Sequence, residues 1–320
     1  MKRIFPLVLL GVVGVSAAPT LLPEVPETNP LTPEKIALGK KLFYDPVLSA
    51  DGTVSCSSCH NPSFAFADHN PVSPGVEGRK GIRNAPTLTN VAFRKSFFFE
   101  GGAKSLELQA VGPITDHNEM ASDVAEVVRK LKADPKYPAL FQEAFGAEPS
   151  MQHVVEALAS FQRTLISFNS PYDQFQRGDL NALNEQQKRG MELFFDKADC
   201  FHCHTGGNFT DELPHNTALY VFDEDPGLAR LTQKDEDIGK FKTPTLRNIA
   251  LTAPYMHDGS KATLREAVEH YNLGGEANLN ADPLMRPLGL TDQEIDDVVA
   301  FLQSLTDEEF INNPAFRESP

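Results

Sequence analysis

Two short segments hold all four cysteines of the chain, and in each of them a histidine directly follows the second cysteine. The segment CSSCH covers residues 56–60, and CFHCH covers residues 200–204. This C-x-x-C-H spacing is used for covalent attachment of c-type haem, in which two thioether bonds fix the porphyrin and the adjacent imidazole binds the iron. The predicted haem-binding residues are Cys56, Cys59, His60, Cys200, Cys203 and His204.

Other uses of these cysteines must be weighed against haem. In an exported protein four cysteines would first suggest two disulfides, and a single C-x-x-C-H could be accidental or part of a zinc site. Two copies that use every cysteine are hard to obtain by chance. We therefore predict two covalent haems, with His60 and His204 as the proximal iron ligands and His202 as a spacer only.

The first 18 residues have the three zones of a secretory signal peptide: two basic residues, an apolar run and a group of small residues. The apolar run is shorter than the ~20 residues that span a bilayer. We predict cleavage near Ala17 or Ala18 and a periplasmic location. An uncleaved membrane anchor is the alternative.

The charge balance narrows the class of partner. The chain has 44 acidic and 29 basic residues, which gives a formal net charge of −15. An acidic protein is a poor ligand for nucleic acid, whose phosphates repel it. The composition therefore favours small molecules or basic proteins as partners, and no nucleic acid.

An internal repeat follows the two cysteine segments. The stretch APTLTNVA from Ala85 matches TPTLRNIA from Thr243 at an offset of 158 residues, and the match continues without gaps. This predicts two cytochrome c-like haem domains related by internal duplication, with long loops. We place the N-terminal domain at 19–170 and the C-terminal domain at 171–320.

The coarse secondary structure is predicted to be mainly α-helical, because capping patterns are frequent and alternating strand patterns are scarce. A long amphipathic helix is expected over residues 151–168. The other helix starts are predicted at the capping residues Thr32, Ser122, Asn184, Thr263 and Thr291.

The offset of 158 points to a difference between the two haem sites. Apolar residues recur at i, i+3, i+4 and i+7 over residues 264–271, which directs Tyr271 inward. The equivalent residue of the first domain is Pro113, which has no atom that can bind iron. If Tyr271 is the distal ligand of the His204 haem, the distal position over the His60 haem is open. Otherwise Tyr271 is a core tyrosine whose hydroxyl finds a partner, and Met256 or Met285 is the ligand.

Seven ordered segments resemble the bacterial di-haem cytochrome c peroxidases and their MauG branch, over residues 32–306. They are CSSCH, RNAPTLTNVAF, FEGGAKSLELQAVGPI, NEM, CFHCH, TPTLRNIALTAPYMHDGSKATLREAVEHYN and LTDQEIDDVVAFLQSL. The resemblance implies an N-terminal peroxidatic haem, a C-terminal electron-transfer haem and a calcium ion between the domains. It implies a protein that is a monomer or a homodimer.

Three positions depart from the conventional peroxidases. Val76 stands where they have a removable distal histidine, and Tyr271 stands where they have a methionine over the second haem. Both departures resemble the MauG branch, which oxidises residues of a partner protein. Phe99 stands where the family has a tryptophan between the haems, and the chain contains no tryptophan.

The resemblance also suggests roles for residues around the haems. Peroxide chemistry needs a group that moves a proton between the two peroxide oxygens, and we assign this role to Glu119, near Pro113; a carboxylate beside a desolvated iron pocket has a raised pKa. The alternative for Glu119 is a solvated loop carboxylate. Gln109 would donate a hydrogen bond to bound peroxide.

Further residues are assigned by the resemblance. Calcium would be bound by the Asn84 side chain and by the carbonyl groups of Thr252 and Pro254, with water as the other ligands. Arg83 and Arg247 would pair with haem propionates, although both would also be ordinary as surface arginines. His257 is expected to have a structural or propionate-side role, whereas no motif supports His215 or His153.

Three functions remain open at this stage. The first is a MauG-like oxidase that uses hydrogen peroxide and withdraws electrons from a protein or small reductant through the His204 haem. The second is a peroxidase that reduces hydrogen peroxide to water with electrons from a small cytochrome or cupredoxin, whose approach an acidic surface would steer. The third is a non-catalytic electron-transfer protein in which both irons are six-coordinate.

Overall fold

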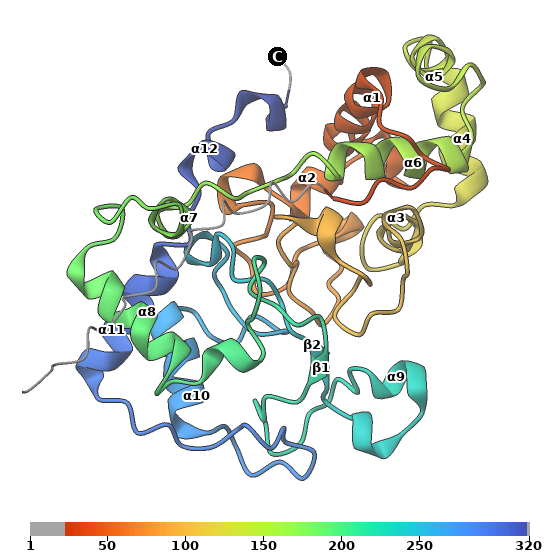
Figure 1. Ribbon diagram of the computed structural model, residues 1–320. Helices are drawn as coiled ribbons and strands as arrows, with labels where there is room; N and C mark the ends of the chain where they lie inside the picture. The colour runs from red at the N-terminus through yellow and green to blue at the C-terminus, as the bar shows by residue number, and fades with distance from the viewer. Residues whose placement is uncertain (1–22, 319–320) are drawn as a thin grey trace, which may run out of the picture.

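The computed structural model describes residues 23–318, and these residues are mainly helical (Figure 1). The predicted signal peptide, residues 1–18, lies outside them. Within the described residues, no helix has the length and the apolar character that a membrane crossing requires. The α-helices are α1 (Pro33–Tyr44), α2 (Cys56–Cys59), α3 (Leu106–Thr115), α4 (Val124–Ala133), α5 (Tyr137–Phe145), α6 (Met151–Gln162), α7 (Pro171–Gln176), α8 (Glu185–Phe195), α9 (Ala229–Thr232), α10 (Leu264–Leu273), α11 (Asp292–Gln303) and α12 (Glu308–Ile311). Strands β1 (Pro214–His215) and β2 (Phe241–Lys242) form a short antiparallel pair.

Four of the five predicted capping residues are confirmed. The side chains of Thr32, Asn184, Thr263 and Thr291 accept hydrogen bonds from backbone N–H groups in the first turns of α1, α8, α10 and α11. The prediction of Ser122 is wrong by one residue. Asp123 caps α4 instead, because its carboxylate accepts from two backbone N–H groups, whereas the Ser122 hydroxyl is buried without a partner within residues 23–318.

The long amphipathic helix is shorter than predicted. It begins at Met151 as expected but ends at Gln162 rather than at 168. Two side-chain hydrogen bonds explain the early end: the Thr164 hydroxyl donates to the Phe161 carbonyl oxygen, and the Ser167 N–H donates to Asn90 Oδ1. Side chains thus compete with the helical backbone at this point.

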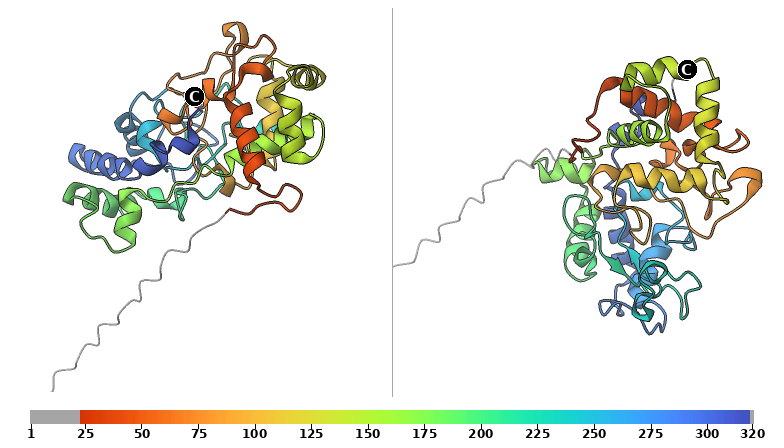
Figure 2. Two further views of the ribbon diagram at one scale, coloured as in Figure 1. Left: turned by 90° about the horizontal axis from the view of Figure 1, so that it is seen from above. Right: turned by 90° about the vertical axis from the view of Figure 1, so that its right-hand side faces the viewer.

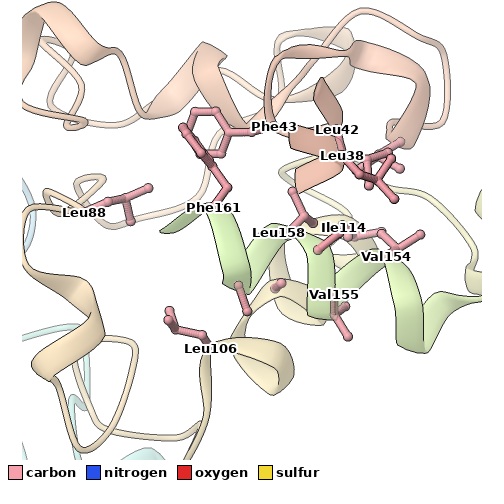
Figure 3. Packing of buried hydrophobic residues seen from close by; sticks show 14 of the residues in the cluster. Leu38, Leu42, Phe43, Leu88, Leu106, Ile114, Val154, Val155, Leu158 and Phe161 are labelled. Atoms are coloured by element: carbon pink, nitrogen blue, oxygen red, sulfur yellow. The ribbon is translucent and has the colours of Figure 1, made fainter. Parts of the chain in front are cut away.

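In the N-terminal half, α1 crosses α6 at close range. A Cβ atom on Gly39 would lie 1.8 Å from the Ala157 carbonyl oxygen, so only glycine allows this approach. The Phe43 and Phe161 rings pack beside the crossing with centroids 5.2 Å apart, and leucines of both helices fill the surrounding core (Figure 3). The crossing is the centre of a cluster that buries side chains from α1, α3, α4, α5 and α6.

The C-terminal half repeats this arrangement with α8 and α11 (Figure 2). A Cβ atom on Gly190 would lie 1.8 Å from the Asp297 carbonyl oxygen, and the Phe194 and Phe301 rings are 5.1 Å apart. Both ends of α10 lie 158 residues after those of α3, as the sequence repeat requires. These matches confirm two cytochrome c-like domains related by duplication.

The C-terminal segment returns to the N-terminal half. Phe310 of α12 and Phe316 of the turn after it belong to the N-terminal core cluster. The Asp307 carboxylate accepts hydrogen bonds from the Ser167 hydroxyl and the Asn169 N–H. Residues 307–316 therefore contact both the N-terminal core and the segment that connects the two halves.

Candidate active site

The first cysteine segment presents its histidine in a form suited to iron. His60 follows α2, and its Nδ1 lies 2.9 Å from the Phe66 carbonyl oxygen. A carbonyl only accepts, so Nδ1 carries the proton and Nε2 keeps its lone pair for a metal. Burial lowers the pKa of His60, which keeps the ring neutral.

The second segment has the same arrangement. His204 Nδ1 lies 3.1 Å from the Phe209 carbonyl oxygen, and burial lowers the pKa of His204 as well. All four cysteines are free thiols, so the two disulfides considered above do not form within residues 23–318. Each half thus offers two thiols and one neutral imidazole, which is the donor set of a c-type haem.

A cavity of about 280 Å³ opens beside the second segment and reaches into the first half. Cys200, Cys203 and His204 line it together with Tyr271 of α10. The Tyr271 hydroxyl has no hydrogen bond from any residue in 23–318, although burial raises the pKa of this phenol. Tyr271 is half-buried and faces the cavity, and its role as a ligand stays a prediction.

The predicted alternatives to Tyr271 are also near this cavity. Met256 and Met285 line the same cavity as Tyr271, so the cavity lining alone does not decide among the three residues. The cavity is otherwise mainly apolar. Its aliphatic lining includes Leu246, Ile249, Leu264, Val268, Leu288, Leu290, Val298 and Leu302.

At the first segment, Val76 takes part in the core instead of facing a metal. Its side chain is only 2% exposed, and its N–H donates to the Glu119 carbonyl oxygen at 2.8 Å. The preceding Gly75 lies so close that a Cβ atom there would be 2.5 Å from the same oxygen. The loop that carries a distal histidine in conventional peroxidases here fixes the backbone of Glu119.

Glu119 lies beside the first pair of cysteines. Its charge raises the pKa of the Cys56 and Cys59 thiols, after the larger effect of burial on both. The side chain remains accessible to solvent, yet desolvation by neighbouring atoms and then the charge of Asp116 raise the pKa of Glu119 to about 7. The role assigned to Glu119 stays a prediction, because its side chain is exposed and does not line the cavity.

The other two predicted catalytic residues both belong to helix α3. Gln109 and Pro113 lie one turn apart on α3 and so share a face. The Pro113 carbonyl oxygen accepts a hydrogen bond from the Met120 N–H at 3.1 Å, which ties the Glu119 loop to the helix. Pro113 and Glu119 are thus held together, and the half-buried Gln109 lies one turn before them.

Comparisons with known proteins agree with this geometry. The sequence model "Di-haem cytochrome c peroxidase" matches residues 33–181, and the model "Cytochrome c" matches residues 187–306. The methylamine utilization protein MauG of Methylorubrum extorquens is 42% identical over 287 residues, which cover 88% of this chain and 81% of MauG. The chain belongs to the di-haem cytochrome c peroxidase and MauG family.

Other members of this family are similar over most of their length. The cytochrome-c peroxidase IdrP1 of a Pseudomonas species is 37% identical over 344 residues, which cover 96% of this chain and 90% of that protein. A crystal structure of a MauG-like protein associated with microbial copper homeostasis has a TM-score of 0.88 and 38% identity, covering 92% of this chain and 95% of that one. Membership makes this chain a di-haem oxidoreductase and implies two c-type haems, as predicted.

The region between the two haem sites of this family member has an aromatic contact instead of a tryptophan. The rings of Phe99 and Phe241 meet edge to face at 6.3 Å, and Phe241 stacks on His257 at 3.9 Å. The Lys242 N–H donates to the Phe99 carbonyl oxygen at 2.7 Å, so β2 is bonded directly to the first half. His257 is buried and lies in the wall of the cavity.

The two arginines assigned to propionates are engaged by carboxylates of the protein. Arg83 forms ion pairs with Glu100 and with Asp225, the latter at 2.6 Å. Arg247 donates to Asp173 at 2.5 Å and to the Gly207 carbonyl oxygen. Their propionate roles stay predictions.

Two other cations face the cavity, and sequence reasoning missed both. Arg94 and Lys242 line it, and burial lowers the pKa of both side chains, that of Lys242 to about 8. Lys242 has one carboxylate partner, Glu212 at 3.2 Å. No motif marks these residues, because only the approach of the two halves brings them together.

The predicted calcium ligands also lie together on this wall. Asn84, Thr252 and Pro254 all line the cavity. Asn84 Nδ2 donates to the Asn70 and Pro71 carbonyl oxygens, which leaves its Oδ1 available. Neither Asn84 Oδ1 nor the Thr252 and Pro254 carbonyl oxygens accept a hydrogen bond from residues 23–318.

His215, like Arg94 and Lys242, is a residue that no motif had indicated. Its ring lies between two carboxylates, with Nδ1 2.6 Å from Asp282 and Nε2 2.9 Å from Asp211. Burial lowers the pKa of this imidazole, but the two carboxylates outweigh burial, and the net shift is upward. The cluster borders Cys203, so a histidine with a raised pKa lies at the edge of the second cysteine segment.

Proposed function

We propose that this chain is an exported, periplasmic di-haem enzyme of the MauG type, which uses hydrogen peroxide at the His60 site and oxidises a protein or small reductant through the His204 site. One observation carries the proposal: the two sites share a fold but differ in their distal residues. Pro113, which has no atom that can bind iron, stands on α3 where Tyr271 stands on α10, and Val76 is buried in the core, whereas Tyr271 lines the cavity of the second site.

The residues around the first site support peroxide chemistry. Cys56, Cys59 and His60 would hold a c-type haem here, and its iron would supply the reaction with peroxide. Glu119 takes the proton from one peroxide oxygen and delivers it to the other, and its pKa of about 7 makes both protonation states available near neutral pH. Gln109 donates a hydrogen bond that orients the peroxide.

At the second site Tyr271 serves as the distal ligand. A phenolate is an anionic oxygen donor that stabilises ferric and higher iron, as axial tyrosine does in catalase. Burial alone opposes ionisation of Tyr271, so its proton leaves only where a metal takes its place. The apolar lining around Tyr271 keeps water from competing for the iron.

The cations and oxygen atoms of the shared cavity have further roles in this proposal. Arg94 is half-buried and Lys242 is buried, and both line the cavity with few carboxylate partners, so they fit the anionic propionates of a haem. Asn84, Thr252 and Pro254 provide three oxygen atoms without hydrogen-bond donors, which suits a calcium ion that keeps several waters. Such an ion would link the two halves and stabilise either a monomer or a homodimer.

A conventional peroxidase is the second candidate. The contact of Phe99 with Phe241 lacks an oxidisable indole between the sites, and the net charge of −15 favours a basic donor such as a small cytochrome or cupredoxin. A purely electron-transferring protein is disfavoured, because it needs a sixth ligand at the His60 site. His69, the other histidine on the loop that carries Val76, is mostly exposed and contacts Asp68 instead.

Spectroscopy of the ferric holoprotein tests the proposal. We expect one high-spin haem and one low-spin haem, and addition of hydrogen peroxide without reductant should produce a long-lived state in which both haems are oxidised. Two low-spin haems would overturn the open first site. Rapid turnover only with a reduced small cytochrome, and only after reduction of the second haem, would favour the conventional peroxidase.

A further inference from the structure

An exposed tyrosine with its own proton acceptor lies outside the cavity. Tyr220 follows β1, and its hydroxyl donates a hydrogen bond to Asp258 Oδ2 at 2.5 Å. The Tyr220 side chain is 38% exposed, and the two residues after it, Val221 and Phe222, are 62% and 76% exposed. The phenol is therefore part of an apolar surface segment, residues 220–222, that a partner can reach.

Tyr220 differs from the other tyrosines that donate a hydrogen bond within residues 23–318. Tyr44 and Tyr255 donate to backbone carbonyl oxygens, which do not take up a proton at neutral pH. Tyr137 donates to a carboxylate, but its side chain is fully buried in the N-terminal core. Tyr220 alone combines solvent exposure with a carboxylate partner.

Asp258 connects this phenol to the cavity wall. It directly follows His257, which is buried, lines the cavity and stacks on Phe241. Phe241 in turn contacts Phe99 of the first half. One hydrogen bond and one peptide unit therefore separate the exposed phenol from the residues between the two haem sites.

The shared proton of Tyr220 and Asp258 stays on the phenol until the phenol is oxidised. Burial acts to raise the pKa of Asp258, but hydrogen bonds from Tyr220 and Ser260 outweigh it and hold this pKa below its usual value. Burial and then the interaction with Asp258 raise the pKa of Tyr220. At neutral pH the pair thus consists of a neutral phenol and a carboxylate.

We propose that Tyr220 is a surface oxidation site for phenolic or other aromatic donors too large to enter the cavity, such as a side chain of a partner protein, with Asp258 as its proton acceptor. This inference rests on the proposed function, because the peroxide-oxidised haem pair is its oxidant. Tyr220 gives one electron to that pair, and its hydroxyl proton moves to Asp258 Oδ2, which leaves a neutral phenoxyl.

The donor then restores Tyr220 and Asp258 to their starting states. It gives one electron to the phenoxyl oxygen, and Asp258 returns its proton to the same atom, while the oxidised donor releases a proton to solvent. Two such cycles use the two oxidising equivalents of one hydrogen peroxide, and the peroxide becomes two waters with the two protons released. Val221 and Phe222 provide the apolar surface that an aromatic donor contacts.

Covalent labelling of the holoprotein tests this site. The protein is treated with hydrogen peroxide and biotin-tyramide, a phenol that couples to tyrosyl radicals, and labelled peptides are located by mass spectrometry. We expect the label at Tyr220, and an electron paramagnetic resonance signal of a tyrosyl radical that disappears in Tyr220→Phe. Asp258→Asn keeps an acceptor oxygen but takes no proton, so it should reduce labelling by about 100-fold. Tyr44→Phe, the matched control, should leave labelling unchanged.

The absorbance change of the haems on addition of peroxide is recorded in every variant. If the haems of the wild type do not respond to peroxide, the proposed function fails and this inference fails with it. If they respond but the label lies at other tyrosines, or Asp258→Asn is labelled as strongly as the wild type, only the surface site is overturned. A response of the haems that is the same in all variants, together with loss of label in Asp258→Asn, supports it.

Discussion

The two haem sites lie in equivalent helical scaffolds, but their residues offer different atoms to a metal. Helices α3 and α10 correspond end to end, and the same helical position holds Pro113 in one and Tyr271 in the other. Proline offers no ligand atom, whereas a phenol offers an oxygen. In the proposed function, this single position separates the site that uses peroxide from the one that a side chain closes.

The helical scaffolds of the two halves are closely similar. Gly39 and Gly190 permit equivalent helix crossings, and Asn90 and Asn248 have the same left-handed backbone conformation at the start of equivalent turns. The differences lie in the loops, such as the segment that fixes Glu119. The duplication thus preserved the helical scaffold of the haem-binding segments. The two halves differ in a few side chains, such as Pro113 and Tyr271, and in their loops.

The largest effect should follow from removal of the ligand that distinguishes the second site. In Tyr271→Phe the low-spin ferric haem should become high-spin, because no oxygen remains to complete its coordination. Electron paramagnetic resonance and absorption spectra would show the change. Tyr255→Phe is the matched control, since Tyr255 lines the same cavity but donates to the Ile249 carbonyl oxygen. An unaltered low-spin signal in Tyr271→Phe would shift the ligand role to Met256 or Met285.

The similarity of the scaffolds can be tested at the two helix crossings. Gly39→Ala and Gly190→Ala each place a Cβ atom against a backbone carbonyl oxygen that cannot move far, so each should lower the free energy of unfolding by about 3 kcal/mol. Denaturant unfolding of the holoprotein measures this. Gly81→Ala is the control, because a Cβ atom there meets nothing within 4 Å. A marked difference between the two crossing variants would mean that the halves are not equivalent scaffolds.

What the sequence could predict depended on local patterns. Spacing alone indicated both haem segments, capping patterns located most helix starts, and the repeat correctly related α10 to α3. These features depend on neighbouring residues or on a comparison of the chain with itself. They need no knowledge of how distant segments meet.

The rest depended on long-range contacts. Burial of Val76 against the Glu119 loop, the return of Phe310 to the N-terminal core and the approach of Arg94 to Lys242 all join residues far apart in the chain. The Ser122 prediction was wrong for a local reason, because the neighbouring Asp123 is the stronger acceptor. Sequence reasoning therefore identified the two haem segments but not the charged residues Arg94 and Lys242.

The smallest of the three effects concerns the proton transfer assigned to the first site. Glu119→Gln should slow the reaction with peroxide by about 100-fold, because the amide cannot accept the proton. The wild-type rate should rise with pH and level off above the Glu119 pKa of about 7, since the carboxylate is the form that accepts the first proton. The variant should show no such rise. Stopped-flow absorbance between pH 5 and pH 9 measures both.

The neighbouring Asp116 sharpens this test. Its charge contributes to the raised pKa of Glu119, after desolvation, so Asp116→Asn should move the midpoint of the rate profile to lower pH without abolishing the reaction. Glu143→Gln is a matched control, because Glu143 is also an exposed glutamate but belongs to another element, α5. An unchanged rate in Glu119→Gln, or a midpoint that does not respond to Asp116→Asn, would remove Glu119 from the mechanism. The two sites would then differ in ligation alone.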